Sequence, residues 1–357
     1  MKVLGLETSC DDTAAGVVTD DHQVLANIVA SQIEIHGPYG GVVPELASRG
    51  HMDAVGPVIA AALEAARLGW DDLDGIAVTH GPGLVGSLLV GVSTAKALSY
   101  AHGVPLLGVN HLEAHIRSVF LDHPDLSFPM LSLVVSGGHT SIYVSRQEGR
   151  YELLSETRDD AAGEAFDKVA KYLGFGYPGG PVVDRLAATG NDRAFKFSRP
   201  RMSDGSLDFS FSGLKTAALL AMRREGIQPL QGTVTDLPAG EAAAADIPQV
   251  IRDLFASFQR AVVEFLVHRV RRVVADTGVG TVTMAGGVAC NSRLRADLAA
   301  AGAQDGFSVA WPRAAYCSDN GAMVAAAGCL LLRQGRVAGL DLDAVPGLTL
   351  QDSAAPA

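Results

Sequence analysis

His111 and His115 stand four residues apart in the segment NHLEAH, and both side chains can bind a metal ion. An α-helix turns about 100° per residue, so the two imidazoles share one face while Glu113 points to the opposite side. The zinc-protease motif HExxH instead puts a glutamate directly after the first histidine, where this chain has Leu112. The pair therefore indicates a metal site of another kind, or two ordinary histidines on a helix surface. Asn110 is a suitable N-cap in either case.

A metal site needs at least a third protein ligand, and Asp319 has the best sequence context for it. It lies in the polar turn of AYCSDNGAM, directly before the apolar segment AMVAAAGCLLL. An aspartate at this place either caps the following helix or ligates the metal, and the sequence leaves both open. Two histidines and one carboxylate would suit Fe(II) or Zn(II) and leave positions for a substrate oxygen.

Two glycine-rich loops follow predicted strands, SGGHT (Ser136–Thr140) and AGGVACN (Ala285–Asn291). Loops without Cβ atoms let backbone N–H groups approach phosphate oxygens. Together with the turn ETSCDDT near the N-terminus, they predict a nucleotide cleft between two lobes. The segment GPGLVGS lacks the lysine of a P-loop, so we interpret Gly81–Ser87 as a tight turn before a closely packed helix.

A further polar group lies in GEAFDKVAKYLGFGYPGGPVVDRLA, which contains Asp167, Lys168, Gly180 and Asp184. Carboxylates beside a nucleotide can accept hydrogen bonds from ribose hydroxyls. The alternative is a set of helix-surface charges around a proline-glycine turn.

These residues must be positioned by a layered scaffold. The first twenty residues predict strand, turn and strand (VLGLET, SCDD, TAAGVVT), and residues 131–145 repeat this plan with LSLVV, SGGHT and SIYVS. We interpret the repeat as an internal duplication in which each lobe contributes one hairpin loop. Strands that alternate with helices predict α/β layers with a largely parallel component. The expected elements are helices at 56–68, 86–102 and 111–120, strands at 75–78 and 106–109, a long scaffolding helix at 248–277, and a strand, glycine turn and helix from 281 to 301.

The composition sets the outer limits. A chain of 357 residues, 48% hydrophobic and 19% charged, is long enough for two domains or two joined lobes. The acidic N-terminus has no long apolar run, which argues against a secretory signal or a membrane anchor. Four scattered cysteines without a CxxC pair are typical of reduced thiols in the cytoplasm. Residues 232–245 and the end from Ser353 are expected to form a mobile loop and a disordered tail.

The net charge of -11 is the wrong sign for a chain that binds nucleic acid alone through phosphate contacts. Two local basic clusters stand against this background. For the second of them, we favour a solvated helix face with C-terminal charges that complement the helix dipole. The clusters are Arg193, Lys196, Arg199 and Arg201 in a polar segment, and Arg269, Arg271 and Arg272 near the end of the long helix.

The motifs, taken in order, resemble the bacterial TsaD family of tRNA N6-adenosine threonylcarbamoyltransferases, once described as glycoprotein endopeptidases. The likeness runs from Lys2 to about Leu330, and its motifs are long and jointly specific. They are LETSCDDT, GGVVPELASR, GPGLVGSLLVG, NHLEAH, LVVSGGHT, DDAAGEAFDK, YPGGP, FSFSGLKTA, GGVACN and CSDNGAM.

The resemblance implies an α/β, actin-like ATPase fold whose two lobes are each built on a ribonuclease H-like unit. We expect an N-terminal lobe of residues 1–110 plus about 318–345, a C-terminal lobe of 111–317, and a tail of 346–357. It implies a metal ion, usually iron, on His111, His115 and Asp319. It further implies contacts to threonylcarbamoyl-AMP, with ATP or ADP able to occupy the same place, from Val134, Val135, Ser136, Gly137, Gly138, Asp167, Gly180, Asp184 and Asn291.

The implied reaction moves the threonylcarbamoyl group to N6 of adenosine 37 in tRNAs that read codons beginning with A. Archaeal and eukaryotic relatives have a tyrosine as a further metal contact where this chain has Val134, so water or substrate is expected to take that coordination position. Asp11, in the first hairpin turn, is our choice for proton management or substrate orientation.

The resemblance also implies partners. These are tRNA, a paralogous TsaB-like subunit docking on the helix at 86–102, and a TsaE-like ATPase, with no membrane and no DNA. A metallopeptidase and a non-catalytic nucleotide-binding scaffold are the main alternatives, and a small-molecule kinase of the same superfamily is a third.

Overall fold

The computed structural model describes residues 1–230 and 247–353. The predicted loop at 232–245 and the chain end after Ser353 lie outside the described residues. Within them, no helix combines the length and the apolar composition that crossing a membrane requires.

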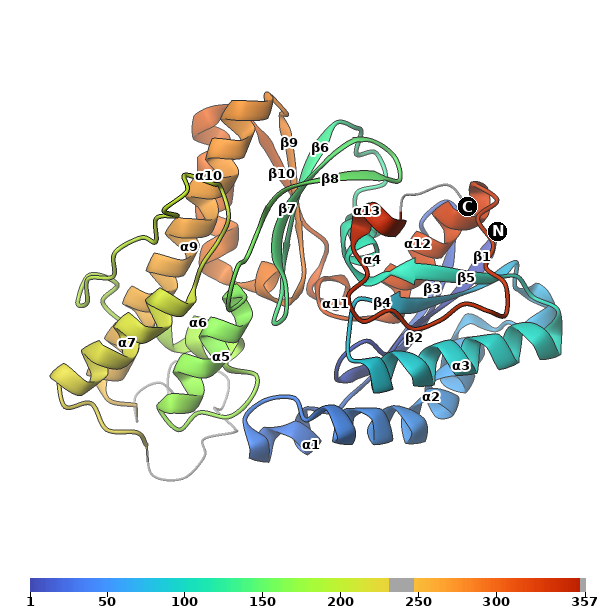
Figure 1. Cartoon of the computed structure of the whole chain (residues 1–357), viewed down its shortest axis with the longest axis horizontal. Coiled ribbons are helices and arrows are strands. Elements are labelled where there is room, and N and C mark those ends of the chain that lie inside the picture. Colours follow the sequence, from blue (N-terminus) through green and yellow to red (C-terminus); the bar gives the residue numbers. More distant parts are fainter. Residues whose placement is uncertain (231–246, 354–357) are drawn as a thin grey trace.

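The first half of the chain forms a five-stranded sheet with the order β3-β2-β1-β4-β5 (Figure 1). The first three strands are antiparallel, and β4 and β5 continue the sheet in parallel. Side chains alternate between the two faces, so Leu4 and Leu6 pack with one hydrophobic cluster while Val3 packs with another. The strands are β1 (Lys2–Glu7), β2 (Asp12–Thr19), β3 (Val24–Ser31), β4 (Gly75–Gly81) and β5 (Leu106–Asn110).

Helices cover both faces of this sheet. Helices α2 (Pro44–Ala66) and α3 (Val85–His102) lie on one face, where Val58, Ile59 and Val92 join the cluster of Leu4. Helix α12 (Gly321–Arg333) comes from the far end of the chain and covers the other face. The sheet is therefore completed by a helix more than two hundred residues away in sequence.

The second sheet repeats the plan of the first. Its order is β10-β9-β6-β7-β8, with β6, β7 and β8 antiparallel and β9 and β10 parallel to β6. The predicted duplication is thereby confirmed, since β6 and β7 occupy the places that β1 and β2 have in the first sheet. The strands are β6 (Met130–Val135), β7 (Thr140–Gln147), β8 (Arg150–Glu156), β9 (Thr281–Ala285) and β10 (Ser308–Ala310).

The largest hydrophobic cluster lies between this sheet and its helices, around Phe166, Phe255 and Phe258. Helix α9 carries sixteen buried residues along its length, as the predicted scaffolding helix should. The helices of this half are α5 (Ala162–Tyr172), α6 (Gly179–Ala187), α7 (Ser212–Arg224), α9 (Gln249–Thr277) and α10 (Ser292–Asp305), and the short helices of the chain are α1 (Ile33–His36), α11 (Ala314–Cys317) and α13 (Leu350–Ser353).

Helix α4 (His111–Ser118) lies between the two sheets and all eight of its residues are buried (Figure 1). It packs against α12 on one side and against β6 and β9 on the other. Leu112 and Ile116 join a cluster with Val134 and with Leu350 of α13. A buried helix at this junction can present its polar residues to both halves of the molecule.

Most of the expected elements are confirmed to within a few residues. The exception is the helix expected at 56–68, which begins twelve residues earlier, at Pro44. Gly50, Gly56 and Pro57 weaken the local preference for helix in this stretch. Burial of Ala47 and His51 against the sheet outweighs that preference, and Pro44 at the first helical position is favourable.

Candidate metal and nucleotide site

Two asparagine caps place the three predicted metal ligands. Strand β5 ends at Asn110, whose side chain accepts hydrogen bonds from the N–H groups of Leu112 (2.9 Å) and Glu113 (3.4 Å) and so starts α4 at His111. At α12 the cap is Asn320, which accepts from the N–H of Met323 at 3.0 Å. Asp319 is therefore not the cap of this helix, and its carboxylate is directed to the histidines.

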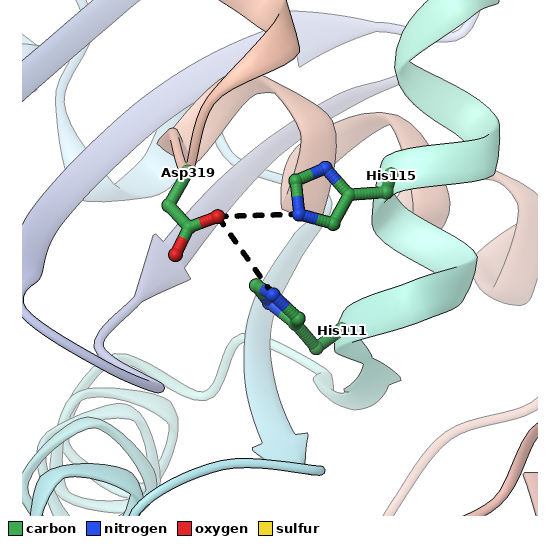
Figure 2. A group of neighbouring side chains, drawn as sticks. All are labelled: His111, His115 and Asp319. Carbon is green, nitrogen blue, oxygen red and sulfur yellow. Dashed lines mark ion pairs between the residues drawn. The ribbon is translucent and has the colours of Figure 1, made fainter. Parts of the chain in front are cut away.

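Figure 2 shows the three side chains converging from α4 and from the turn before α12. Asp319 Oδ1 lies 3.2 Å from His115 Nε2 and 3.7 Å from His111 Nε2. One ligand atom of each residue falls within 4.8 Å of the others. Bonds of about 2.0–2.2 Å to a shared metal would set neighbouring ligand atoms about 3.0–3.5 Å apart, and the two distances to Asp319 Oδ1 are close to that range.

Burial decides between the two interpretations of the histidine pair. His115 has no exposed surface and His111 has 4%, so the alternative of two helix-surface histidines is wrong. His115 Nδ1 is buried without a hydrogen-bond partner, and His115 Nε2 faces only the Asp319 carboxylate. A buried imidazole without partners is costly unless something else occupies its lone pair. The donor set of two imidazoles and a carboxylate thus fits a divalent transition-metal ion.

Glu7, at the end of β1, holds the back of His111. Its Oε2 lies 3.1 Å from His111 Nδ1 and accepts from Thr79 Oγ1 at 2.7 Å, while its Oε1 accepts from the N–H of Ser9 at 2.6 Å. An ionised carboxylate only accepts, so Nδ1 carries a proton, and Nε2 is the nitrogen that a metal ion would bind in place of a proton. Sequence reasoning missed Glu7, although an acidic residue ending a buried strand was a usable signal.

The charges in this group stabilise one another. Burial lowers the pKa of His111, but the negative charges of Glu7 and Asp319 outweigh this effect and raise the pKa to about 9. Burial raises the pKa of Glu7, and the neighbouring His111 ring more than reverses this. The pKa of Asp319 lies below its usual value because the attraction of the two histidines exceeds the effect of burial. Both carboxylates are therefore ionised at neutral pH.

His139 is a second residue that sequence reasoning did not single out, although it belongs to the SGGHT loop. Its ring centroid lies 5.9 Å from that of His111. Burial of the ring, together with repulsion from His111 and His115, lowers its pKa to about 3. A neutral imidazole therefore stands beside the ligand group.

The two glycine loops meet at the ends of β6 and β9. A Cβ atom on Gly286 would lie 2.3 Å from the carbonyl oxygen of Val135, so only glycine allows this approach. Ser136 stiffens its loop: its N–H donates to His139 O at 2.8 Å and its Oγ accepts from His139 N at 3.1 Å. Gly137 and Gly138 between them are exposed. Their backbone is available to a ligand.

Val134 and Val135 take a different place from the other loop residues. Both side chains are fully buried in β6, and their backbones pair with Ser141 and Thr140 of β7. A substrate contact from these two valines stays a prediction. In the structure, these two residues hold the start of the glycine loop at the end of strand β6.

A third group joins Asp11, Asp167 and Gly180. Asp167 Oδ1 accepts from the N–H groups of Gly179 (2.7 Å) and Gly180 (3.3 Å). Tyr177 Oη donates to Asp11 Oδ2 at 3.1 Å, linking the turn after β1 to the segment before α6. Burial, with smaller repulsion from Asp11, raises the pKa of Asp167 to about 6 despite the two amide donors. Tyr177 is a contact that the sequence did not reveal.

Asp184 and Asn291 lie together at the start of α10, where both already make structural hydrogen bonds. Asp184 accepts from the N–H of Ser292 at 3.1 Å and from Ser292 Oγ at 2.8 Å, and also binds Gln259. Asn291 caps α10 by accepting from the N–H of Leu294 at 3.0 Å. Asp184 thus ties α6 to α10 and is more than a surface charge.

Comparisons with known proteins agree with one another. A family model described as "TsaD: tRNA N6-adenosine threonylcarbamoyltransferase" matches residues 23–326. Proteins named tRNA N6-adenosine threonylcarbamoyltransferase from Geotalea uraniireducens and from Desulfitobacterium hafniense are similar throughout. The first is 50% identical over 346 residues, 97% of this chain and 96% of the relative, and the second is 47% identical over 350 residues, 98% of each.

Among solved structures, HypF from T. kodakarensis superposes with a TM-score of 0.61 at 16% identity, covering 93% of this chain and 48% of that one. Component A of the (R)-2-hydroxyglutaryl-CoA dehydratase from Acidaminococcus fermentans superposes with a TM-score of 0.51 at 16% identity, covering 94% and 98%. At this level of identity the likeness concerns the fold.

Proposed function

The chain belongs to the family of tRNA N6-adenosine threonylcarbamoyltransferases, and from this premise we propose how its own residues carry out the transfer. The family forms N6-threonylcarbamoyladenosine, so the chain is an acyltransferase with tRNA as substrate, and the fold is actin-like. The peptidase and scaffold alternatives are not favoured. The proposal concerns the donor, the metal, the roles of the residues and the partners.

The observation that carries the proposal is the convergence of His111, His115 and Asp319 at the junction of the two sheets. We propose that these three residues hold one divalent ion, Fe(II) or Zn(II). When bound, such an ion supplies a Lewis acid beside the acyl oxygen and a template for the substrate. Glu7 keeps His111 in the tautomer that can ligate it.

We propose that the donor is threonylcarbamoyl-AMP and that the glycine loops bind its phosphate. Backbone N–H groups of Gly137 and Gly138 would stabilise the charge that develops on the departing phosphate, and Ser136 would support them through its hydrogen bonds with His139. Val134 and Val135 set the position of this loop. ATP or ADP would bind the same loops.

The ribose of the donor is proposed to bind Asp167 and Asp184, whose carboxylates accept hydrogen bonds from hydroxyl groups. Gly180 leaves room beside Asp167, since a Cβ atom at Gly180 would meet no atom within 4 Å. Asn291 completes this side from the start of α10. Positioning of this kind accounts for a large part of the rate of a transfer between two bound molecules.

The acceptor nitrogen is proposed to be N6 of adenosine 37. It attacks the carbamoyl carbon, AMP leaves, and N6 gives up a proton. Asp11 is the proposed proton acceptor or orienting group, and Tyr177 fixes its carboxylate by donating from Oη.

We further propose the division into lobes at 1–110 plus about 318–345, and at 111–317, with 346–357 as a tail. The packing of α12 on the first sheet supports it. A TsaB-like subunit and a TsaE-like ATPase are proposed partners, because a chain of net charge -11 is poorly suited to binding tRNA alone. The proposed compartment is the cytoplasm, because the substrate tRNA is present there.

The test combines the chain with its proposed partners, threonylcarbamoyl-AMP and unmodified tRNA, followed by mass analysis of the nucleosides. Wild type should yield N6-threonylcarbamoyladenosine, and a His111→Ala, His115→Ala variant should yield none while keeping its circular dichroism spectrum. Equal product from the folded variant would refute the role of the histidines. Absence of product from the wild type would refute the donor and partner assignments.

A further inference from the structure

A pocket of about 260 Å³ opens beside α9, on the half of the molecule that carries the second sheet. Its polar lining is basic and comes from two separate parts of the chain. Arg199 and Arg201 lie in the extended segment before α7, and His268 and Arg269 lie on α9. The pocket brings together two of the four residues of the first basic cluster and one of the three residues of the second.

The rest of the second cluster is already neutralised. Arg271 pairs with Asp305 at 2.6 Å, and Arg272 pairs with Asp276 at 2.9 Å. The last turn of α9 contains no basic residue, so the part of the interpretation that concerns the helix dipole is wrong, whereas Arg271 and Arg272 do lie on a solvated face, with side chains 40% and 62% exposed. Arg269 therefore differs from Arg271 and Arg272, because it lines the pocket while they form ion pairs with aspartates elsewhere.

Carboxylates near the pocket are also occupied. Asp204 and Asp208 both pair with Arg158, at 2.6 and 2.7 Å. Across residues 1–230 and 247–353, no ion pair joins a carboxylate to Arg199, Arg201 or Arg269. Three arginines therefore line the pocket without an ion pair to a carboxylate of this part of the chain, although Asp208 lies near enough to raise the pKa of Arg269.

Arg269 is the least expected member of the group. It is only 9% exposed, and its Nε is buried without a hydrogen-bond partner. Its guanidinium carbon lies 5.1 Å from the centre of the Phe265 ring, which offers a face but no counter-charge. Burial and the nearby Arg199 lower its pKa. A buried, unpaired cation is unfavourable for folding, so its presence calls for a ligand that supplies the missing charge.

We propose that this pocket binds a phosphodiester group of the tRNA backbone. Guanidinium groups match phosphate oxygens with paired hydrogen bonds, and three of them around one pocket suit a singly charged phosphodiester that remains partly exposed. The contact would position tRNA without reading its sequence. The assignment rests on the proposed function, and it gives an acidic chain one defined place for a polyanion.

The test measures tRNA affinity by fluorescence anisotropy over a range of salt concentrations, with the chain and its proposed partners together. Arg199→Glu, Arg201→Glu should weaken binding about tenfold near physiological salt and lower the salt dependence by about one phosphate contact. The matched control is Arg223→Glu, Arg224→Glu, which makes the same charge change at two exposed arginines of α7. Equal loss in both variants, or no loss in the first, would overturn the proposal.

Arg269→Met gives a second, independent measurement, because methionine keeps a long side chain over Phe265 without its charge. The pocket assignment predicts weaker tRNA binding together with a higher Tm. A purely structural arginine would instead give a lower Tm and unchanged binding, which contradicts the assignment. A pocket that takes up inorganic phosphate in 31P NMR while tRNA affinity stays unchanged in the variants also contradicts it.

These outcomes separate the pocket from the proposed function. If the wild-type assembly forms N6-threonylcarbamoyladenosine while the pocket variants bind tRNA normally, only the pocket assignment fails. If the wild-type assembly neither binds tRNA nor forms product, both fail.

Discussion

Glu7 contacts the proposed metal site through a single nitrogen, Nδ1 of His111. By accepting from His111 Nδ1, it directs Nε2 to the position shared with His115 and Asp319. We expect Glu7→Gln to lower metal affinity by roughly 10- to 100-fold, as is usual when the partner of a ligating histidine is lost. Metal content after dialysis against graded chelator concentrations measures this.

The matched control is Glu113→Gln, on the same helix as the histidines. Glu113 is also buried, but burial raises its pKa, so glutamine resembles its neutral form. This variant should retain metal like the wild type. If both variants lost metal equally, a general loosening of α4 would explain the result and the specific role of Glu7 would be wrong.

Asp167 provides a pH-dependent prediction. Its folded pKa of about 6 lies above the ordinary value of 3.8, so the folded chain holds this proton more tightly than the unfolded chain. Its contribution to stability is complete below pH 3.8 and is lost as the pH rises through about 6. Asp167→Asn keeps an acceptor for the Gly179 N–H and removes the titration.

The difference in the free energy of unfolding, variant minus wild type, should therefore rise by about 1 kcal/mol when the pH is raised from about 5 to about 8. Urea titrations at the two pH values measure the difference. A gap between variant and wild type that stays constant with pH would show that the carboxyl titrates normally.

At this scale the sequence identified the proposed ligands better than the residues that hold them in place. His111, His115 and Asp319 could be proposed because helix periodicity and the turn before α12 constrain them locally. Glu7 and Tyr177 were missed because their partners lie 104 and 166 residues away. Contacts at such separations depend on how the elements are arranged in the folded chain, which a local sequence pattern does not reveal.

Among the elements, α12 positions Asp319 by lying unusually close to the first sheet. A Cβ atom on Gly321 would lie 2.1 Å from the backbone nitrogen of Gly16, and one on Gly5 would lie 2.2 Å from that of Ala325. Backbone atoms cannot move aside as a flexible side chain can. The glycines at this contact therefore set the height of α12, and with it the position of the carboxylate two residues before Gly321.

We expect Gly321→Ala to lower the free energy of unfolding by about 3 kcal/mol through overpacking, and to weaken metal binding as well. Denaturant titration and metal analysis measure the two effects. Gly213→Ala is the control, since Gly213 lies in α7 with no atom near its added Cβ. Unchanged stability and metal content in Gly321→Ala would show that the contact is not tight.

The elements themselves were largely predictable where the signal was local. The two hairpins follow from strand runs broken by short polar turns, and α3, α4, α9 and α10 follow from helical spacing and caps. The start of α2 was not predictable, because Gly50, Gly56 and Pro57 oppose helix and only packing against the first sheet overrides them. The pairing of β10 with β9 likewise depends on long-range contacts.

At the scale of the whole molecule, α3 offers an apolar surface for a partner. Val85, Leu89 and Tyr100 of this helix are exposed, Tyr100 by 79%. We expect Val85→Asp, Leu89→Asp to abolish binding of the TsaB-like subunit, because burying two added charges in an interface is unfavourable. Thermal stability of the isolated chain should stay within about 1 kcal/mol of the wild type. Size-exclusion chromatography of the mixed proteins reports binding.

Leu220→Asp on α7 is the control, since Leu220 is 58% exposed on the opposite half of the molecule. It should leave the complex intact. Retention of the partner by the α3 variant would place the interface elsewhere.

The duplicated sheets explain why one buried helix can serve both halves. Helix α4 joins them, its histidines meet the turn before α12, and the glycine loop after β6 brings His139 beside His111. The central claim is that a metal ion on His111, His115 and Asp319 is required for threonylcarbamoyl transfer. Removing the metal ion and adding it back therefore tests this requirement.

The most direct measurement is a titration of metal-depleted chain with Fe(II) or Zn(II) in the complete transfer assay, following N6-threonylcarbamoyladenosine and bound metal together. Product formation should return in proportion to bound metal and level off at one ion per chain, and Asp319→Ala should neither bind the ion tightly nor recover. Full product formation by the metal-depleted wild-type chain would contradict the account.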